Sequence, residues 1–358
     1  MNASFLERIT DVAISAFLWV FRIVVILIVV VGSTLTLASG KYGIEQWIDL
    51  IGDGLTLGSI YALIALGYTM VYGILRMINF AHGEIFMAGI FGGYFTASAL
   101  ALSGFLNANP LASLIAIVLM MLVAAGVSTA IALGVERIAY RPLRGAPRLV
   151  PLISAIGASF FLQYTFRGVF GPGLYAYPEV EILEGQVPIA ILNMQWVDVL
   201  VIVSSVLMML GLYLFVMRTR VGTAIRAVSE DRDAAALMGI DANRAIVLTF
   251  AIGAALAGAA GVLYGLSFAS FNFFSGFLPG LKAFTAAVLG GIGNVPGAML
   301  GGLFLGLVES VGPTLFLDGL DVPSPTQLKD VIAFTMLVLV LVFRPSGILG
   351  ERLARSRA

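Results

Sequence analysis

Long apolar runs separated by short charged segments are the feature that most constrains how this chain folds. Eight such runs stand out, at residues 12–37, 52–75, 85–102, 111–135, 149–170, 196–217, 246–268 and 330–343. Most of them approach the roughly 20 residues that a helix needs to cross the ~30 Å hydrocarbon core of a bilayer. The pattern predicts an all-α fold, a polytopic bundle of transmembrane helices.

The composition supports a membrane protein and excludes other classes. Of the 358 residues, 60% are hydrophobic and 11% are charged, and the mean hydropathy is +1.03. A soluble domain cannot bury so large an apolar fraction in one core. The 20 basic and 20 acidic residues leave no net charge that would indicate a nucleic-acid partner.

Reactive and metal-binding side chains are scarce. The chain has no cysteine, which excludes disulfides and thiolate sites, and its single histidine, His82, excludes a histidine-rich metal cluster. We therefore expect no metal and no cofactor. The first residues lack the basic start and small-residue cleavage site of a signal peptide, so we expect the run 12–37 to be retained as a helix.

A further apolar region, residues 269–316, is interrupted by the glycine-rich stretch GGIGNVPG (290–297). It predicts either two more helices or one re-entrant pair, for a total of eight to ten spans. Lipid cannot satisfy the hydrogen bonds of a broken backbone, so such a segment has to be sheltered by protein or line a cavity.

The arginines predict the orientation. The loop 136–148 carries four arginines, the loop 218–244 carries five and the tail 344–358 carries four, whereas the segment 171–195 has three glutamates and no basic residue. Since cytoplasmic loops are enriched in lysine and arginine, we expect the arginine-rich loops inside and the acidic segments outside. Counting spans along the chain then places both termini in the cytoplasm.

The longest polar stretch, RTRVGTAIRAVSEDRDAAALMGIDANR (218–244), is built as a helix rather than as a flexible linker. Residues 223–238 contain no proline or glycine and are rich in alanine and leucine, which favours a helix. Gly222 and Gly239 stand where such a helix would begin and end. We expect one short helix with a small alanine face (234–236) that a partner could approach. A helix that merely connects two spans fits the pattern equally well.

Three stretches, in this order, carry a family resemblance: GLTLGSIYALIALGYTMVYGILRMINFAHGEIFMAG (54–89), GTAIRAVSEDRDAAALMGI (222–240) and GFLPGLKAFTAAVLGGIGNVPGAMLGG (276–302). Together they resemble the LivH-type permease of bacterial branched-chain amino acid ABC transporters, over roughly residues 48–350. The resemblance implies a permease domain at 46–350 with a coupling loop at 218–245. It leaves residues 1–45 as an extra segment with one transmembrane helix and residues 351–358 as a short basic cytoplasmic tail.

The resemblance also implies partners and site residues. In that family the loop that matches 222–240 is a coupling helix that seats on the ATP-hydrolysing subunit. The residues that this implies for the contact are Arg226, Glu230, Asp231, Arg232, Asp233 and Ala235. The expected assembly has two ATP-binding cassette subunits, a second related permease and a periplasmic amino-acid-binding protein, in the bacterial inner membrane. We expect a heterodimer of permeases, and a homodimer also fits.

The chain lacks the means to hydrolyse ATP by itself. The sequence G-x-x-x-x-G-K-[ST] does not occur, and the nearest candidate, GFLPGLK (276–282), lacks the Gly-Lys pair and hydroxyl that hold phosphate and magnesium. We therefore expect a transport subunit and not an enzyme. Relatives that resemble this chain also move urea, short amides or aromatic acids, which stay as alternative substrates. An ion-coupled secondary transporter is a further alternative, but few acidic residues lie within the runs.

The stretch RMINFAHGE (76–84) has two interpretations. In the first, Asn79 caps a helix at the membrane surface, and the negative charge of Glu84 stabilises the first turn of that helix. Arg76 then anchors the chain at the cytoplasmic lipid headgroups. In the second, the helix breaks inside the membrane beside the translocation route, with His82 and Glu84 near that route.

Other residues are candidates for the route or its surroundings. The sequence around Asn294 resembles that around Asn79, and paired interruptions in two halves of a chain indicate a central pathway. Both asparagines are followed by glycines three or four residues apart, at 89 and 92–93 and at 297 and 301–302. Glycines at this spacing also indicate close helix packing. Tyr61 and Tyr68 could line the route or pack between helices. Lys282 could pair with Glu84 or extend to the membrane surface.

Overall fold

The computed structural model describes residues 3–147, 149–187, 194–344 and 346–350. Within these ranges nine helices are long and apolar enough to cross a membrane. Eight of them contain the apolar runs found in the sequence, which confirms the all-α bundle. The long helices are α1 (Ala3–Ser39), α2 (Ile44–Leu75), α3 (His82–Leu102), α4 (Pro110–Val135), α5 (Leu149–Phe170), α6 (Trp196–Arg218), α9 (Ala242–Phe268), α11 (Val295–Leu317) and α12 (Lys329–Phe343).

Shorter elements connect the long helices. They are η1 (Glu136–Tyr140), which is a π-helix, the 3₁₀ turns η2 (Arg141–Leu143), η3 (Glu181–Leu183), η4 (Asp318–Leu320) and η5 (Pro325–Leu328), and the helices α7 (Arg220–Glu230), α8 (Arg232–Leu237) and α10 (Phe277–Gly290). Two short strands, β1 (Tyr175–Ala176) and β2 (Ser270–Phe271), pair antiparallel with Tyr175 opposite Phe271. The basic tail 351–358 lies outside the described residues.

The interrupted region 269–316 forms one half-length helix and one full-length helix. The 14 residues of α10 extend only about 21 Å at the ~1.5 Å rise of an α-helix, so α10 is too short to cross a bilayer. A tight turn follows, in which Gly291 and Gly293 have φ of 105° and 97°, values that glycine adopts without strain. The side chain of Asn294 then caps α11 by accepting a hydrogen bond from the amide of Gly297 at 3.0 Å.

Glycines bring α2 and α11 close together along their length. A Cβ added at Gly58 would lie 2.9 Å from the Cα of Leu303, and one added at Gly306 would meet the carbonyl of Gly54 at 2.5 Å. Such spacing of small residues lets two membrane helices approach until their backbones touch. Gly301 and Gly302 also pack closely, since an added Cβ would collide with the carbonyl oxygen of Ala286 and with the Cα of Ala62, respectively, which confirms the packing interpretation for these two glycines.

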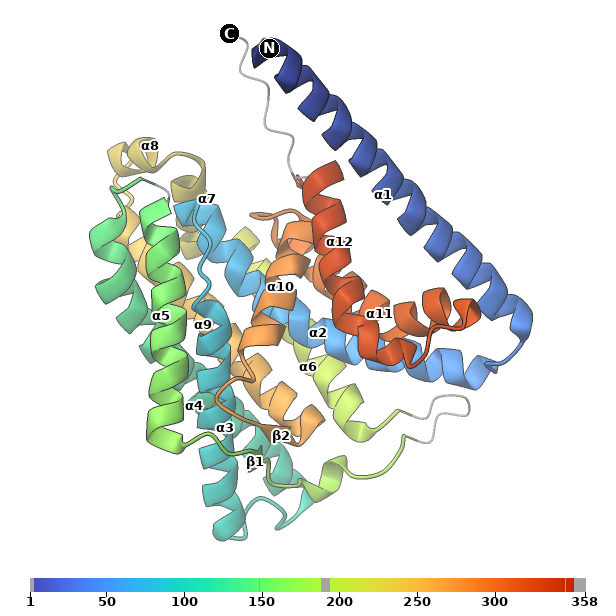
Figure 1. Cartoon of the computed structure of the whole chain (residues 1–358). Coiled ribbons are helices and arrows are strands. Elements are labelled where there is room, and N and C mark those ends of the chain that lie inside the picture. Colours follow the sequence, from blue (N-terminus) through green and yellow to red (C-terminus); the bar gives the residue numbers. More distant parts are fainter. Residues whose placement is uncertain (1–2, 148, 188–193, 345, 351–358) are drawn as a thin grey trace.

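Helix α3 lies at the centre of the other half of the bundle, beside α4, α5 and α9 (Figure 1). Every residue from His82 to Gly93 is buried. Gly89 of α3 meets Gly258 of α9, where an added Cβ would lie 2.5 Å from the partner Cα. A helix enclosed on all sides by protein can carry polar groups that lipid would exclude.

The arginine-rich segments gather at one end of the molecule. Figure 1 shows the start of α1, the end of α12 and the pair α7–α8 at this end, and β1 with the loop between α3 and α4 at the other. The loop that follows α4 joins the first group, because Arg144 donates a hydrogen bond to Asn243 at the start of α9 at 2.7 Å. The arginine-rich loops therefore lie at the end opposite the acidic segment, and which end faces the cytoplasm stays a prediction.

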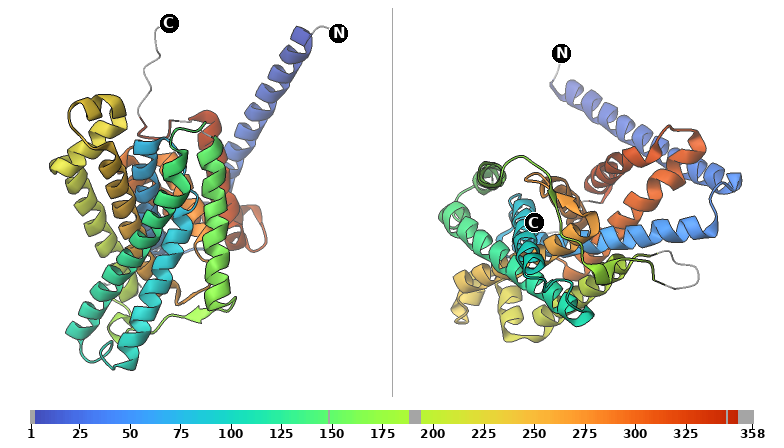
Figure 2. Two further views of the ribbon diagram at one scale, coloured as in Figure 1. Left: turned by 90° about the vertical axis from the view of Figure 1, so that its left-hand side faces the viewer. Right: turned by 90° about the horizontal axis from the view of Figure 1, so that it is seen from below.

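Helix α1 leans away from the bundle. Both views in Figure 2 show its first half separated from the other helices, and none of its most apolar window is buried. Its polar attachments are at its far end, where Lys41 pairs with Asp318 at 2.9 Å and the hydroxyl of Thr36 accepts from the amide of Gly319 at 2.8 Å. Within the bundle, α1 packs on α11 and η4.

We expect deletion of residues 1–40 to leave the remaining bundle folded. Helix α1 packs on α11 and η4 and places Arg22 5.5 Å from the Phe343 ring of α12. Because its most apolar window is not buried, its loss removes little of the core, and the unfolding temperature should change by less than about 5 °C. Thermal unfolding of the purified protein in detergent, compared with the full-length chain, measures this. Loss of a cooperative transition would show instead that α1 is part of the core.

Candidate functional site

The chain between α2 and α3 is broken inside the bundle. Helix α2 ends at Leu75, Arg76 has a left-handed backbone with φ of 53°, and α3 begins only at His82. Asn79 is 2% exposed and Ala81 is fully buried. Figure 1 shows α3 starting deeper in the bundle than the end of α2. The break therefore begins at the surface, where Arg76 is exposed, and ends inside the bundle, where Asn79 and Ala81 are buried. Its place beside a translocation route stays a prediction.

Asn79 does not cap α3, so that prediction is wrong. Ala81 occupies the N-cap position without a side-chain hydrogen bond. The Asn79 Oδ1 atom instead accepts a hydrogen bond of 2.5 Å from the hydroxyl of Tyr140, which is fully buried in the π-helix η1. Asn79 therefore ties the broken segment to the end of α4. Tyr140 was not predicted from the sequence. It lies in a π-helical turn, and such turns often mark functional positions.

Glu84, in the first turn of α3, is a buried carboxyl group with few hydrogen-bond partners to replace the water it loses. It is 1% exposed, and its Oε1 atom accepts from Ser159 Oγ and Gln163 Nε2 of α5, each at 3.4 Å. The Oε2 atom has no hydrogen-bond partner among the described residues. A buried charge usually needs an ion pair or several short hydrogen bonds.

The beginnings of α3 and α10 meet directly at the break. A Cβ added at Gly83 would lie 2.7 Å from the carbonyl oxygen of Gly276, and one added at Gly280 would lie 2.8 Å from the Cα of Gly83. Only glycine permits this approach. The two interrupted helices therefore share one small region in the centre of the molecule.

A cavity of about 250 Å³ opens beside this meeting point. It is bounded by residues of α2, the broken segment, α3, α5 and α10, namely Tyr68, Phe80, Gly83, Glu84, Ile156, Ser159, Phe160, Phe277, Gly280 and Leu281. Of the residues proposed for the route, Tyr68 and Glu84 line this cavity.

His82 lies behind the cavity wall. Its ring packs edge-on against Tyr68, with ring centroids 4.9 Å apart, and it occupies the space left by the missing side chain of Gly67. His82 thus supports Tyr68 from the bundle side.

Tyr61 and Lys282 belong to a different cluster. Lys282 is 5% exposed, and its Nζ atom lies 2.5 Å from Glu309 and 2.6 Å from Asp330. It lies 5.9 Å from the Tyr61 ring. Both expectations for Lys282 are wrong: it neither pairs with Glu84 nor extends to the surface. Its partners come from α11 and α12, far along the chain.

Asn294 is also separate from the cavity. Its amide Nδ2 donates to the carbonyl of Leu349 at 2.9 Å, which fixes the segment after α12 onto the turn between α10 and α11. Asn294 therefore caps a helix, and the structural counterpart of the break near Asn79 is the start of α10.

The loop 218–245, for which the sequence predicts one coupling helix, forms two helices. Asp231 interrupts the run with an extended backbone, and its Oδ1 atom caps α8 by accepting from the amides of Asp233 and Ala234, both at 2.9 Å. Gly222 lies inside α7, where an added Cβ would come 2.6 Å from Val216 Cα. The predicted end at Gly239 is confirmed, with φ of 82°.

The expected alanine face (234–236) is found only in part, because Ala234 and Ala236 are exposed and Ala235 is not. Ala235 is only 4% exposed because it packs onto this chain's own core. Leu237 and Met238, which the sequence analysis missed, are 90% and 82% exposed. Five of the six expected coupling residues are exposed on the same two helices or between them, namely Arg226, Glu230, Asp231, Arg232 and Asp233.

Two arginines attach the segments at this end of the molecule to the bundle: Arg76 holds α7, and Arg144 holds the loop after α4. Arg76, at the start of the broken segment, donates from Nη2 to the carbonyl of Ser229 in the last turn of α7 at 3.1 Å. Arg144 pairs with the buried Glu136 and bonds Asn243. Burial lowers the pKa of Arg144 below its usual value while Glu136 opposes that shift, so the guanidinium remains charged.

Comparison with known proteins identifies the family. The family described as "Branched-chain amino acid transport system / permease component" matches residues 50–341. This chain belongs to that family. The matched range of the permease begins within α2, so α1 lies outside it.

Individual relatives cover most of the permease. It is 47% identical over 318 residues to the high-affinity branched-chain amino acid transport system permease protein BraD of Pseudomonas aeruginosa, covering 86% of this chain and 97% of that protein. It is 42% identical over 319 residues to the corresponding LivH protein of Escherichia coli, covering 84% and 94%. A nucleoside ABC transporter permease, NupB of Lactococcus lactis, is 30% identical over 35% of this chain and 34% of its own length. No solved structure matches the permease.

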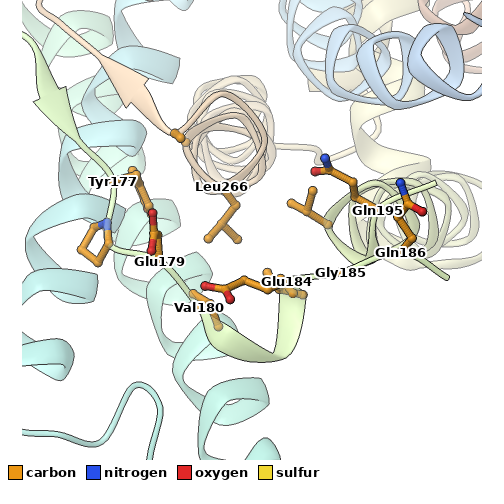
Figure 3. Close-up of a pocket in the computed structure, with 13 residues that line it drawn as sticks. Tyr177, Glu179, Val180, Glu184, Gly185, Gln186, Gln195 and Leu266 are labelled. Atoms are coloured by element: carbon orange, nitrogen blue, oxygen red, sulfur yellow. The ribbon is translucent and has the colours of Figure 1, made fainter. Parts of the chain in front are cut away.

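A second cavity, of about 520 Å³, lies at the acidic end of the permease (Figure 3). Figure 3 shows Glu179, Val180 and Glu184 on one side, Gln186 and Gln195 on another, and Leu266 of α9 between them. Both glutamates are exposed. This cavity is polar at its rim and faces the end that the arginine distribution predicts to be outside.

We expect Gly280→Ala to destabilise the permease by about 1–3 kcal/mol, because the added methyl would meet the backbone of Gly83 and the two helix beginnings would have to separate. Denaturant unfolding in detergent measures the difference. Gly126→Ala in α4 is the matched control, since nothing lies within 4 Å of its added Cβ, and it should be neutral or stabilising by up to ~1 kcal/mol. Equal effects of the two substitutions would contradict the close contact.

Proposed function

We propose that this protein is the permease subunit of an ATP-driven ABC importer for branched-chain, hydrophobic amino acids. The observation that carries the proposal is the 47% identity to BraD over 97% of that permease's length. A match of this extent includes the transmembrane helices and the loops between them, and therefore the parts that form a path and contact partners. The short match to a nucleoside permease covers only a third of the chain and favours no other substrate.

The energy comes from separate subunits in this proposal. The sequence contains no G-x-x-x-x-G-K-[ST] motif, so phosphate and magnesium would be held elsewhere. The partners are two ATP-binding cassette subunits, a second related permease and a periplasmic binding protein. The arginine-rich end faces the cytoplasm of a bacterial inner membrane and the acidic end, with the cavity of Figure 3, faces the binding protein.

The helix pair α7–α8 is the contact for the ATPase subunit. Leu237 and Met238 are almost fully exposed at the tip of α8, outside the helices that span the membrane. Apolar side chains in such a position favour burial by a partner, and the charged residues around them would form the polar rim of an interface. Through the hydrogen bond from Arg76 to Ser229, motion of this pair reaches the broken segment and the cavity.

Reconstitution tests the proposal. Vesicles that contain this permease with its companion permease, ATPase subunits and binding protein should accumulate leucine against a gradient when ATP is supplied. Vesicles with this chain alone should not. Uphill leucine uptake by the isolated chain would refute the proposal, as would a complete complex that moves no branched-chain amino acid.

A double substitution tests the docking surface. Leu237→Ser with Met238→Ser should reduce co-purification of the ATPase subunit and ATP-driven leucine uptake by about tenfold or more, because buried apolar anchors carry much of an interface's free energy. The unfolding temperature of the permease should not change, since neither side chain packs on its core.

The control for this test is Leu102→Ser. Leu102 is also 90% exposed but lies at the end of α3, on the opposite end of the molecule (Figure 1). It should leave co-purification and uptake unchanged. If the control and the double substitution behave alike, α8 is not the docking surface.

A further inference from the structure

The central cavity combines one closed, polar end with one open, apolar end. Glu84 at the closed end is 1% exposed, whereas Ile156 and Phe160 of α5 at its rim are 41% and 50% exposed. Phe277 and Leu281 of α10 form the facing apolar wall. The cavity therefore runs from a buried carboxyl group to the surface between α5 and α10, which face each other across the front of the bundle in Figure 1.

Two polar atoms in this cavity lack partners. The Glu84 Oε2 and Tyr68 Oη atoms are buried and make no hydrogen bond within the described part of the chain. Buried polar atoms are seldom left unpaired, because each loses its hydrogen bonds to water. Two such atoms on the wall of one cavity indicate a ligand that carries both a cationic and an anionic or accepting group.

The Glu84 carboxyl group is not balanced by the side chains around it. Its two hydrogen bonds come from neutral side chains at 3.4 Å, too long to offset the loss of solvation. Lys282, the buried lysine of α10, is engaged by Glu309 and Asp330, and none of the ion pairs among the described residues includes Glu84. No group of three or more metal-ligating side chains gathers in the described ranges, so a lone carboxylate suits an organic ammonium group better than a divalent ion.

The size and lining of the cavity restrict the rest of the ligand. At about 250 Å³ it lies just below the range of about 300–1,000 Å³ that holds drug-sized molecules, which suits a single amino acid. Phe80, Phe277 and Leu281 offer an apolar surface for a branched side chain. A charged side chain would have to lie against these groups unpaired.

We propose that this cavity is a transient binding site for the transported amino acid within the permease. The Glu84 carboxylate receives the α-ammonium group, the Tyr68 hydroxyl donates to the α-carboxylate, and the branched side chain lies on Phe80, Phe277 and Leu281. His82 is a positioning residue that holds the Tyr68 ring from behind. The inference rests on the proposed transport function and assigns the substrate groups to particular side chains.

Binding to the purified complex without its binding protein tests this site. Radiolabelled leucine is the probe, and two analogues compete: isopentylamine, which lacks the carboxylate, and isocaproate, which lacks the amine. Isopentylamine should compete and isocaproate should not. Glu84→Gln should weaken leucine binding at least about tenfold, as expected for loss of a hydrogen bond to a charged group. Tyr68→Phe should weaken leucine binding but not isopentylamine binding.

Two further variants keep the test decisive. Ser205→Ala removes another buried hydroxyl without a hydrogen-bond partner, in α6 and outside the cavity, and should bind leucine as the wild type does. If Glu84→Gln does not assemble, Phe160→Trp narrows the cavity mouth from a half-exposed position and should weaken leucine binding more than alanine binding. Unchanged leucine binding in Glu84→Gln, or in Phe160→Trp where only that variant assembles, would overturn the inference.

Uptake separates this inference from the proposed function. In vesicles with all subunits, Glu84→Gln should reduce leucine uptake at least about tenfold while binding-protein-stimulated ATP hydrolysis continues. If the wild-type complex transports leucine and Glu84→Gln transports it equally well, only the binding site is refuted. If the wild-type complex does not transport leucine, the proposed function itself fails.

Discussion

The centre of this permease depends on one constraint: a backbone that leaves the helical conformation at membrane depth must find its hydrogen bonds in protein. The inner part of the segment 76–81 meets this constraint, because Asn79 and Ala81 are buried and Asn79 is held by Tyr140. Close contact between Gly83 and Gly280 closes the gap that two interrupted helices would otherwise leave. The cavity forms because the beginnings of α3 and α10 touch through glycines. Glycines have no side chains that could fill the space beside this contact.

Buried charges in the permease divide into two kinds. Lys282 with Glu309 and Asp330 ties α10, α11 and α12 together, and Glu136 with Arg144 fixes the loop after α4. In both clusters opposite charges offset their own desolvation, as a scaffold requires. Glu84 stands apart because its hydrogen-bond partners are neutral side chains and none of the ion pairs among the described residues includes it. In a fold that pairs its other buried acids so directly, an unpaired carboxylate on a cavity wall is better explained by a ligand than by packing.

Local patterns in the sequence predicted much of the fold, and the failures share one cause. The apolar runs located eight helices, and Gly239 located the end of α8, because both signals act over a few residues. Asn79 was misassigned as a cap because its partner, Tyr140, lies 61 positions away. The partners of Lys282, the contact of Gly83 with Gly280 and the burial of Ala235 are likewise set by tertiary packing. Asp231 is the exception, since an aspartate that can cap a helix competes locally with the helix interior.

The position of the break also determines how coupling could reach the cavity. Arg76 has a left-handed backbone that costs a non-glycine residue free energy, and its side chain holds the last turn of α7. Four residues later Phe80 forms part of the cavity wall. If α7–α8 is the docking site that we propose, a shift of this pair would act on a short, non-helical segment that can change its dihedral angles without unwinding a helix. The rigid helices α2 and α3 on both sides would confine the change of dihedral angles to the segment beside the cavity. Alternating access requires a conformational change at such a place.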